Sequence, residues 1–226
     1  MCGRITLEEL TWREFREWLS LVSWPEAEIA TSYNVPPTAM LPIVRRTREG
    51  LAGAFARWGL VPPWHKGTLR EWRAHTINAR AEEVANKPAY RDAYRRQRCL
   101  VLVSGYYEWQ VREGRKHPHY IHPSGNAPAL IMAGLWTEVR LPDHAGLTCT
   151  VLTEAVRQPL DVVHDRMPVM MPVEAIDVWL DGQPVDQLPR LPMEALAWHE
   201  VGTAVSAVRN DGPDLIRQVE EPTPLL

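Results

Sequence analysis

The sequence has 226 residues, a formal net charge of −3, 45% hydrophobic residues and 23% charged residues. A single domain of this length can bury about 70% of the surface that its unfolded chain exposes, so no disulfide is required for stability. The slightly acidic balance argues against a protein that coats nucleic acid by bulk electrostatics. It still allows a local groove in which arginines from several segments follow a phosphate backbone.

The cysteines and the N-terminal residues bear on the compartment. Cys99 and Cys149 lie in strand-like apolar runs, and with Cys2 they make an odd count without the spacing of a disulfide framework or a zinc ribbon. This usage predicts a reducing compartment and no bound metal. Charged residues recur through the first twenty positions, and no uncharged stretch reaches membrane-spanning length. We therefore expect a cytoplasmic protein without a membrane partner.

The expected elements are mostly short strands. Thr6 and Glu9 form a capping-box pattern ahead of apolar residues at helical spacing, which predicts an amphipathic N-terminal helix. Further helices are expected at residues 81–85, 89–96, 173–180 and 193–199. Strands are expected at residues 41–45, 54–60, 98–103, 106–111, 119–122, 129–135, 147–153 and 204–208. This order favours an α+β fold in one domain, with a mostly antiparallel, barrel-like sheet as core and peripheral helices.

Cys2 directly follows Met1, and its small side chain favours removal of that methionine. The new terminus would have an α-amine with a pKa of about 7.7–8.0 beside a thiol with a pKa of about 8.5. Both nucleophiles can react with one aldehyde, because the amine forms a Schiff base and the thiol then closes a five-membered thiazolidine. Taken alone, Cys2 is more simply an incidental small residue near a chain end. The remaining motifs favour the reactive terminus.

Two segments combine aromatic and polar residues. Trp58 and Trp64 flank a proline-rich turn. Trp58 is the expected core residue, whereas Trp64 is the candidate for stacking on a base, which is worth about 1–3 kcal/mol. Asn78 and Arg80 stand two residues apart, so an extended backbone would direct both side chains to one face. The alternative is that Asn78 caps a helix.

Two further segments contain candidate proton-transfer groups. Glu108 lies in an aromatic strand, and a core-facing glutamate there would have a raised pKa that suits proton transfer. The alternative is a glutamate that faces solvent. His164 precedes Asp165 and Arg166 and can titrate near neutrality, although a histidine after two valines is more often structural.

These segments belong to an ordered set of motifs. The set consists of Met1-Cys2-Gly3-Arg4, Tyr33-Asn34-Val35-Pro36-Pro37-Thr38, Trp58-Gly59-Leu60-Val61-Pro62, Ile77-Asn78-Ala79-Arg80, Arg98-Cys99-Leu100, Gly105-Tyr106-Tyr107-Glu108-Trp109, Ala133-Gly134-Leu135-Trp136 and His164-Asp165-Arg166-Met167-Pro168-Val169. Together they resemble the SOS-response-associated peptidase (SRAP) family of abasic-site processing proteins, which cross-link themselves to DNA. The resemblance implies one domain over residues 1–213. Residues 214–226, which are rich in proline and acidic residues, are expected to form a loosely held tail. The chain departs from the family pattern at Ala39, away from the candidate catalytic residues, and at Ser104, where an acidic residue is common and whose change alters the charge around Glu108.

The resemblance implies a mechanism that needs no cofactor. Cys2, as the mature N-terminal residue, would react with the aldehyde of an abasic site in single-stranded DNA, with or without adjacent duplex, and form a stable thiazolidine that protects the lesion. Asn78 would orient Cys2 and the sugar, Glu108 would relay protons of the amine, and His164 would protonate the sugar ring oxygen. Strand cleavage by β-elimination would compete until the ring closes, and Met1 would be removed autoproteolytically.

The resemblance also implies how DNA is held, in a protein that acts as a monomer. Arg4, Arg80 and Arg166 correspond to arginines near the flanking phosphates, and Trp64 to a residue against a base. Binding without sequence readout would follow, because an abasic site offers no base to read.

Two other functions remain open at this point. A thiol peptidase or amidohydrolase would use Cys2 with His164 as base. A metal-binding module would use His117, His119 and His122, but strand alternation would direct His122 away from the other two.

Overall fold

One sheet of the protein closes into a barrel in this computed structural model, which describes residues 2–219. The barrel strands follow one another as β10 (His144–Ala155), β4 (Leu51–Trp58), β3 (Met40–Arg46), β6 (Arg98–Val103) and β9 (Leu130–Leu141), and pairing between β9 and β10 closes the ring. Only the β10–β4 pair within this ring is parallel. The expected barrel-like, mostly antiparallel α+β fold is therefore confirmed.

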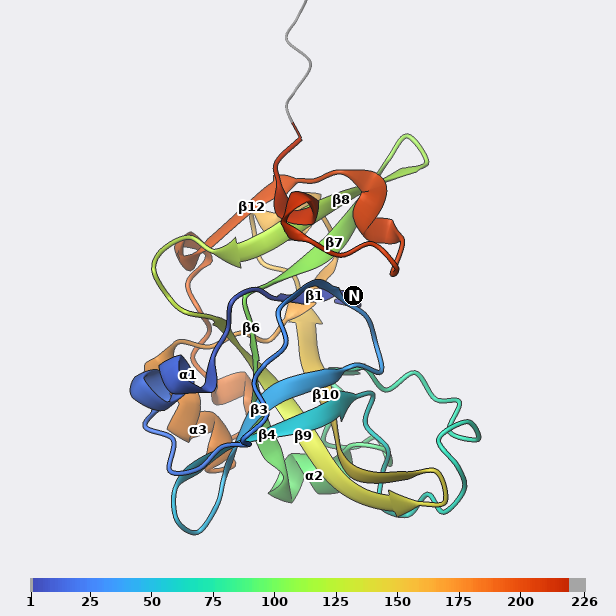
Figure 1. Cartoon of the computed structure of the whole chain (residues 1–226), viewed down its shortest axis with the longest axis vertical. Coiled ribbons are helices and arrows are strands. Elements are labelled where there is room, and N and C mark those ends of the chain that lie inside the picture. The colour runs from blue at the N-terminus through green and yellow to red at the C-terminus, as the bar shows by residue number, and fades with distance from the viewer. Residues whose placement is uncertain (1, 220–226) are drawn as a thin grey trace, which may run out of the picture.

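A second sheet lies at one end of the barrel (Figure 1). Its order is β12 (Leu196–Glu200), β8 (Arg115–Pro123), β7 (Gly105–Arg112), β1 (Ile5–Leu7) and β2 (Ser32–Val35). Only Ser104 separates β6 from β7, so the chain passes directly from the barrel into this sheet. Because β1 pairs with both β2 and β7, the residues just before it are brought to the junction of the two sheets.

Two short strands extend the barrel sheet beside β10. β5 (Asn78–Arg80) pairs with β10 in parallel, and β11 (Arg166–Pro168) pairs with β10 in antiparallel orientation. Neither strand was expected from the sequence, because three residues show no clear alternation. Both contain candidate site residues, so β10 determines how far apart these residues lie.

The helices are short and peripheral, as expected. They are α1 (Trp12–Leu19), α2 (Arg91–Arg96) and α3 (Ile176–Leu180), with 3₁₀ segments at Leu160–Val162, Val173–Ala175, Val185–Gln187, Met193–Ala195, Thr203–Ser206 and Pro213–Ile216. Within residues 2–219 there is no helix with the length and apolar character needed to span a bilayer.

The N-terminal helix begins later than predicted. The capping box is formed by Thr11 and Glu14, and α1 buries Trp12, Phe15 and Leu19. Thr6 instead lies within β1, where its hydroxyl contacts the Ser104 hydroxyl at 2.8 Å. Two capping-box patterns follow one another here, and pairing of β1 with its neighbours decides which one is used.

Three other predicted elements are wrong. Residues 81–85 form turns, residues 204–208 fall mostly in a 3₁₀ segment, and residues 193–199 divide between a 3₁₀ turn and β12. Trp198 pairs with Ile121 of β8, so ladder hydrogen bonds outweigh the local helix propensity of the sequence Met-Glu-Ala-Leu-Ala. The predicted loose tail also differs for residues 214–219. Leu215 is buried, and the Val219 amide donates to the Glu200 carbonyl at 2.9 Å. Residues 220–226 lie outside the described part.

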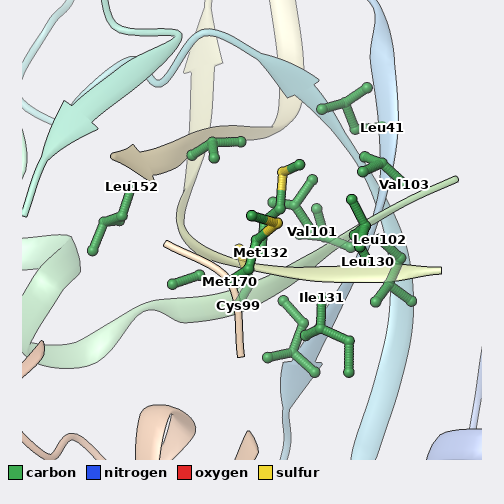
Figure 2. Packing of buried hydrophobic residues seen from close by; sticks show 14 of the residues in the cluster. Leu41, Cys99, Val101, Leu102, Val103, Leu130, Ile131, Met132, Leu152 and Met170 are labelled. Atoms are coloured by element: carbon green, nitrogen blue, oxygen red, sulfur yellow. The ribbon is translucent and has the colours of Figure 1, made fainter. Parts of the chain in front are cut away.

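The main core packs against both faces of the barrel strands, since consecutive residues of β6 and β9 are buried (Figure 2). Met132 and Met170 are fully buried and form an isolated bridge, which joins the segment after β11 to β9. Cys99 and Cys149 are fully buried free thiols, as expected, and burial raises the pKa of both. Both thiols are interior residues of barrel strands, as expected for structural cysteines.

Candidate active site

Asn78 fixes the position of the N-terminal segment. It begins β5 opposite Val151 of β10, so it belongs to a strand and not to a helix cap. Its Nδ2 donates to the carbonyl oxygen of Cys2 at 2.6 Å. The hydroxyl of Tyr90 donates to the Asn78 carbonyl at 3.1 Å. The side-chain amide is therefore held by the strand and directed at the backbone of Cys2.

The side chain of Cys2 is completely buried. Burial is the main cause that raises the pKa of its thiol far above the ordinary value, and the nearby Glu108 carboxylate raises it further. The thiol is therefore protonated at neutral pH. Cysteine hydrolases require the opposite, a thiolate stabilised by a neighbouring positive charge.

The side chain of Glu108 faces the protein interior from the second sheet. It lies on β7 opposite His119 of β8, and it is only 4% exposed. The solvent-facing alternative is therefore wrong. Burial raises the pKa of its carboxyl group, while the neighbouring His164 lowers it to a smaller extent. A carboxyl group in this environment can exchange protons nearer to neutral pH than an exposed glutamate does.

His164 reaches Glu108 from a different part of the chain. It lies in the loop between the 3₁₀ segment Leu160–Val162 and β11, and its Nε2 is 3.9 Å from Oε2 of Glu108. The Arg166 amide donates to His164 Nδ1 at 3.0 Å, which leaves the proton of the neutral ring on Nε2, facing Glu108. Protonation of Nδ1 would instead pair the ring with Asp165, whose Oδ1 is 2.8 Å away.

Tyr106, Glu108, His164 and Arg166 line one small cavity of about 10 Å³. Tyr106 precedes Glu108 by two residues on β7, so both side chains lie on the same face of the strand. The cavity has room for about one water molecule. It joins the second sheet to the loop that contains His164.

Two of the predicted DNA-binding residues are accessible. Trp64 is 54% exposed, and its ring meets the Trp72 ring edge to face at 5.5 Å. Trp58, in contrast, is fully buried as expected, and its indole nitrogen donates to the Ile77 carbonyl. The side chain of Arg80 is 58% exposed at the end of β5, with Glu83 at 3.9 Å.

The other two predicted DNA-binding residues are engaged within the protein. Arg166 makes a bidentate pair with Glu82, at 2.6 and 2.9 Å, and also donates to the Thr153 carbonyl. Arg4 is 9% exposed and donates to Asn34 Oδ1 at 2.6 Å and to the Val205 carbonyl at 2.9 Å. Either guanidinium would have to share or leave these partners to bind a phosphate.

Sequence reasoning missed four polar residues that lie around Asn78, Glu108, His164 and Arg166. They are Glu82, Tyr90, Tyr106 and Thr153. Tyr106 had a detectable signal, because strand alternation places it beside Glu108. The others had none, since their partners lie 12 to 84 positions away in the sequence.

The histidines of the proposed metal module are used otherwise. His117 Nδ1 lies 2.8 Å from Glu200 Oε1, and the His122 ring stacks on Tyr120 at 5.1 Å. Throughout residues 2–219, no three His, Cys, Asp or Glu side chains are grouped so that they could hold a metal ion.

The fold is a closed β-barrel with an added sheet. A cysteine, an amide, a carboxylate and an imidazole meet at the junction of the two, and this combination is the basis for assigning the protein to a class. The sequence profile of the SOS response associated peptidases (SRAP) matches residues 1–208. The chain belongs to this family, as its motifs indicate.

Relatives and solved structures agree. Abasic site processing protein YoqW of Bacillus subtilis is 33% identical over 96% of this chain and 99% of its own length. Abasic site processing protein HMCES of Gallus gallus is 31% identical over 92% of this chain and 70% of its own. The crystal structure of a Bordetella bronchiseptica protein matches with a TM-score of 0.76 and 25% identity, covering 89% of this chain and all of that one.

Proposed function

We propose that this protein processes abasic sites in single-stranded DNA by capturing the aldehyde of the lesion on Cys2 as a thiazolidine. Membership of the SRAP family and the names of its relatives support abasic-site processing. The observation that favours capture through Cys2 is the 2.6 Å hydrogen bond from Asn78 to its carbonyl. A half-buried strand amide that holds the backbone of residue 2 would pre-orient both nucleophiles of a terminal cysteine.

The reaction begins after Met1 has been removed. The freed α-amine of Cys2 attacks the aldehyde carbon, a C–N bond forms, and one water molecule leaves to give a Schiff base. The thiol sulfur then bonds to the imine carbon, and the thiol proton goes to the imine nitrogen. Amine, thiol and aldehyde thus become a thiazolidine and water.

The electrostatics favour this order of events. The thiol is neutral in the resting state because burial raises its pKa. A protonated Schiff base would add a positive charge next to the sulfur, and an opposite charge favours the thiolate. Sulfur therefore becomes a strong nucleophile only after the amine has reacted. The same resting thiol disfavours the alternative peptidase that pairs Cys2 with His164.

Glu108 and His164 supply proton transfer in this proposal. Glu108 accepts the proton of the attacking amine, because its carboxyl group is buried and close enough to Cys2 to affect the thiol pKa. His164 acts in its imidazolium form, with Nδ1–H facing Asp165 and Nε2–H facing Glu108. It gives the Nε2 proton to the ring oxygen of the sugar while the anomeric hydroxyl loses its proton, so the ring opens to the aldehyde. Until the thiol closes the ring, β-elimination at the Schiff base competes and cleaves the strand.

DNA contacts in this proposal come from the accessible residues. Trp64 stacks on a base near the lesion, and Arg80 pairs with a flanking phosphate. Arg4 and Arg166 keep the rim of the site in place through the partners described above. The protein would act as a monomer on cytoplasmic DNA, without sequence readout.

The test uses untagged protein and a single-stranded oligonucleotide with one abasic site, followed by a denaturing gel and intact mass measurement. We expect one covalent band, with the mass of protein lacking Met1 plus DNA minus one water molecule. Cys2→Ser should abolish the heat-stable adduct, whereas the core variant Cys149→Ala should retain it. A residue added before Cys2 should also prevent the adduct. A heat-stable band from Cys2→Ser would contradict the thiazolidine.

A further inference from the structure

A second concave surface begins one residue before Asn78. It is a pocket of about 320 Å³ between the end of β4 and the loop over residues 69–77, and Ile77, which precedes Asn78 in the chain, is one of its lining residues. Its volume lies within the range of about 300–1,000 Å³ for small-molecule sites. We call it the Trp72 pocket, after its aromatic wall. Some of its lining residues belong to the sequence motifs, but no role inferred from those motifs uses this pocket.

The cations of the Trp72 pocket point to an anionic ligand. The cations are Arg57 and Arg73, and the pocket lining contains no acidic residue within the described chain. Arg57 Nη1 donates to the Gly59 carbonyl at 3.3 Å, and burial lowers the pKa of this guanidinium. Gly59 has φ of +124°, and a Cβ there would lie 3.0 Å from Arg57 Nη1. Glycine therefore leaves the room that Arg57 occupies.

The aromatic wall is held rigidly. The indole nitrogen of Trp72 donates to Thr76 Oγ1 at 3.2 Å. Its ring meets Trp64 at 5.5 Å and 74°, and His65 at 5.3 Å and 55°. An aromatic ring fixed before binding loses little conformational entropy when a base stacks on it.

The chemistry that fits a planar aromatic wall beside cations is that of a nucleotide. We propose that the Trp72 pocket binds one nucleotide of the DNA strand that flanks the abasic site, with its base on Trp72 and its phosphate on Arg57 and Arg73. This proposal rests on the proposed function, because it extends the strand away from Cys2. The proposal also connects the pocket with the stacking residue Trp64, because the ring of Trp72 contacts the ring of the exposed Trp64.

The test measures non-covalent binding, so that it is independent of the cross-link. Fluorescence anisotropy would use a single-stranded oligonucleotide with a tetrahydrofuran site, which has no aldehyde. Arg73→Gln should reduce the slope of log K against log salt by about 0.7, the value for one phosphate contact in single-stranded DNA. Trp72→Leu should weaken binding about 5- to 150-fold, which corresponds to the loss of one stacked base.

Arg70→Gln is the matched control, because Arg70 is exposed in the same loop but does not line the pocket. Binding by Arg73→Gln and Trp72→Leu like wild type would overturn the proposal, and so would an equal loss in Arg70→Gln, which indicates a diffuse basic surface. If Trp72→Leu fails to fold, binding by Arg73→Gln and by His75→Gln tests the proposal instead, because both side chains are exposed and line the pocket.

One further measurement distinguishes a nucleotide of the DNA strand from a free nucleotide. Another distinguishes failure of the pocket proposal from failure of the proposed function. Deoxyadenosine monophosphate should bind only weakly. If it binds tightly to wild type and not to Arg73→Gln, while the oligonucleotide binds equally to both, the pocket serves a free nucleotide and the strand proposal is wrong. Wild-type protein that binds the oligonucleotide through the pocket but forms no adduct with an abasic site would refute the proposed function alone.

Discussion

The hydrogen bond from Asn78 to Cys2 allows the most direct test of how the nucleophile is positioned. Asn78→Ala removes the donor at 2.6 Å from a carbonyl whose residue is fully buried. A buried acceptor left without its partner costs about 1–3 kcal/mol. β1 begins at Ile5, so the segment before it can move to hydrate this carbonyl without unfolding the barrel. The loss should therefore appear as displacement of Cys2.

The assay is single-turnover cross-linking to abasic single-stranded DNA, with the melting temperature measured in parallel. If the positioning of Cys2 loses about 1–3 kcal/mol, the activation free energy rises by that amount and the cross-linking rate falls about 5- to 150-fold. The melting temperature should fall by less than about 4 °C, because 1 kcal/mol of global stability shifts a domain of this size by about 2–4 °C. Asn86→Ala is the matched control, since Asn86 is exposed in the turns after β5.

Two results would refute the reasoning. An unchanged rate in Asn78→Ala would show that the amide does not position the nucleophile. A melting temperature lowered by 10 °C or so, with the slow rate restored on cooling, would show that Asn78 stabilises the fold, and that the rate reports only unfolding.

Three other variants test the remaining inferences. In Glu108→Gln, the stability gained over wild type should grow from pH 4 to pH 8 in denaturant titrations. Burial raises the pKa of Glu108 in the folded state above its unfolded value. The wild type therefore has its full stability below the unfolded pKa and loses about 1.4 kcal/mol for each unit of difference between the folded and unfolded pKa values as pH rises through the folded pKa. A stability difference between variant and wild type that stays constant with pH would contradict the raised pKa. Gly134→Ala should lower the melting temperature by about 2–12 °C, because its Cβ would lie 2.7 Å from a Val101 methyl, whereas Gly202→Ala, with open space, should not. Arg4→Gln should lower the melting temperature and leave the salt dependence of DNA binding unchanged, and the reverse pattern would make Arg4 a phosphate contact.

Local sequence was sufficient for the long elements of the barrel. β6 matches its prediction at residues 98–103, and β3, β9 and β10 differ only at their ends. Their alternation or continuous apolar character reflects burial on one or both faces, which is the strongest local signal. The ordered motifs also indicated the family, and with it the residues to examine.

The arrangement of the site depended on pairing between distant segments. Asn78 meets Cys2 because β5 adds to β10, and Glu108 meets His164 because β7 continues from the barrel while a loop before β11 returns to it. A three-residue strand has too little local preference to reveal itself, so only its hydrogen-bonded partners establish it.

The same physical reason separates two arginines that looked alike in sequence. Arg4 is buried and bonded inside the protein, whereas Arg80 faces solvent. Residue type determined what each side chain can do. Tertiary packing decided which of them is accessible, because burial depends on contacts that are far apart in the chain and that no local pattern encodes.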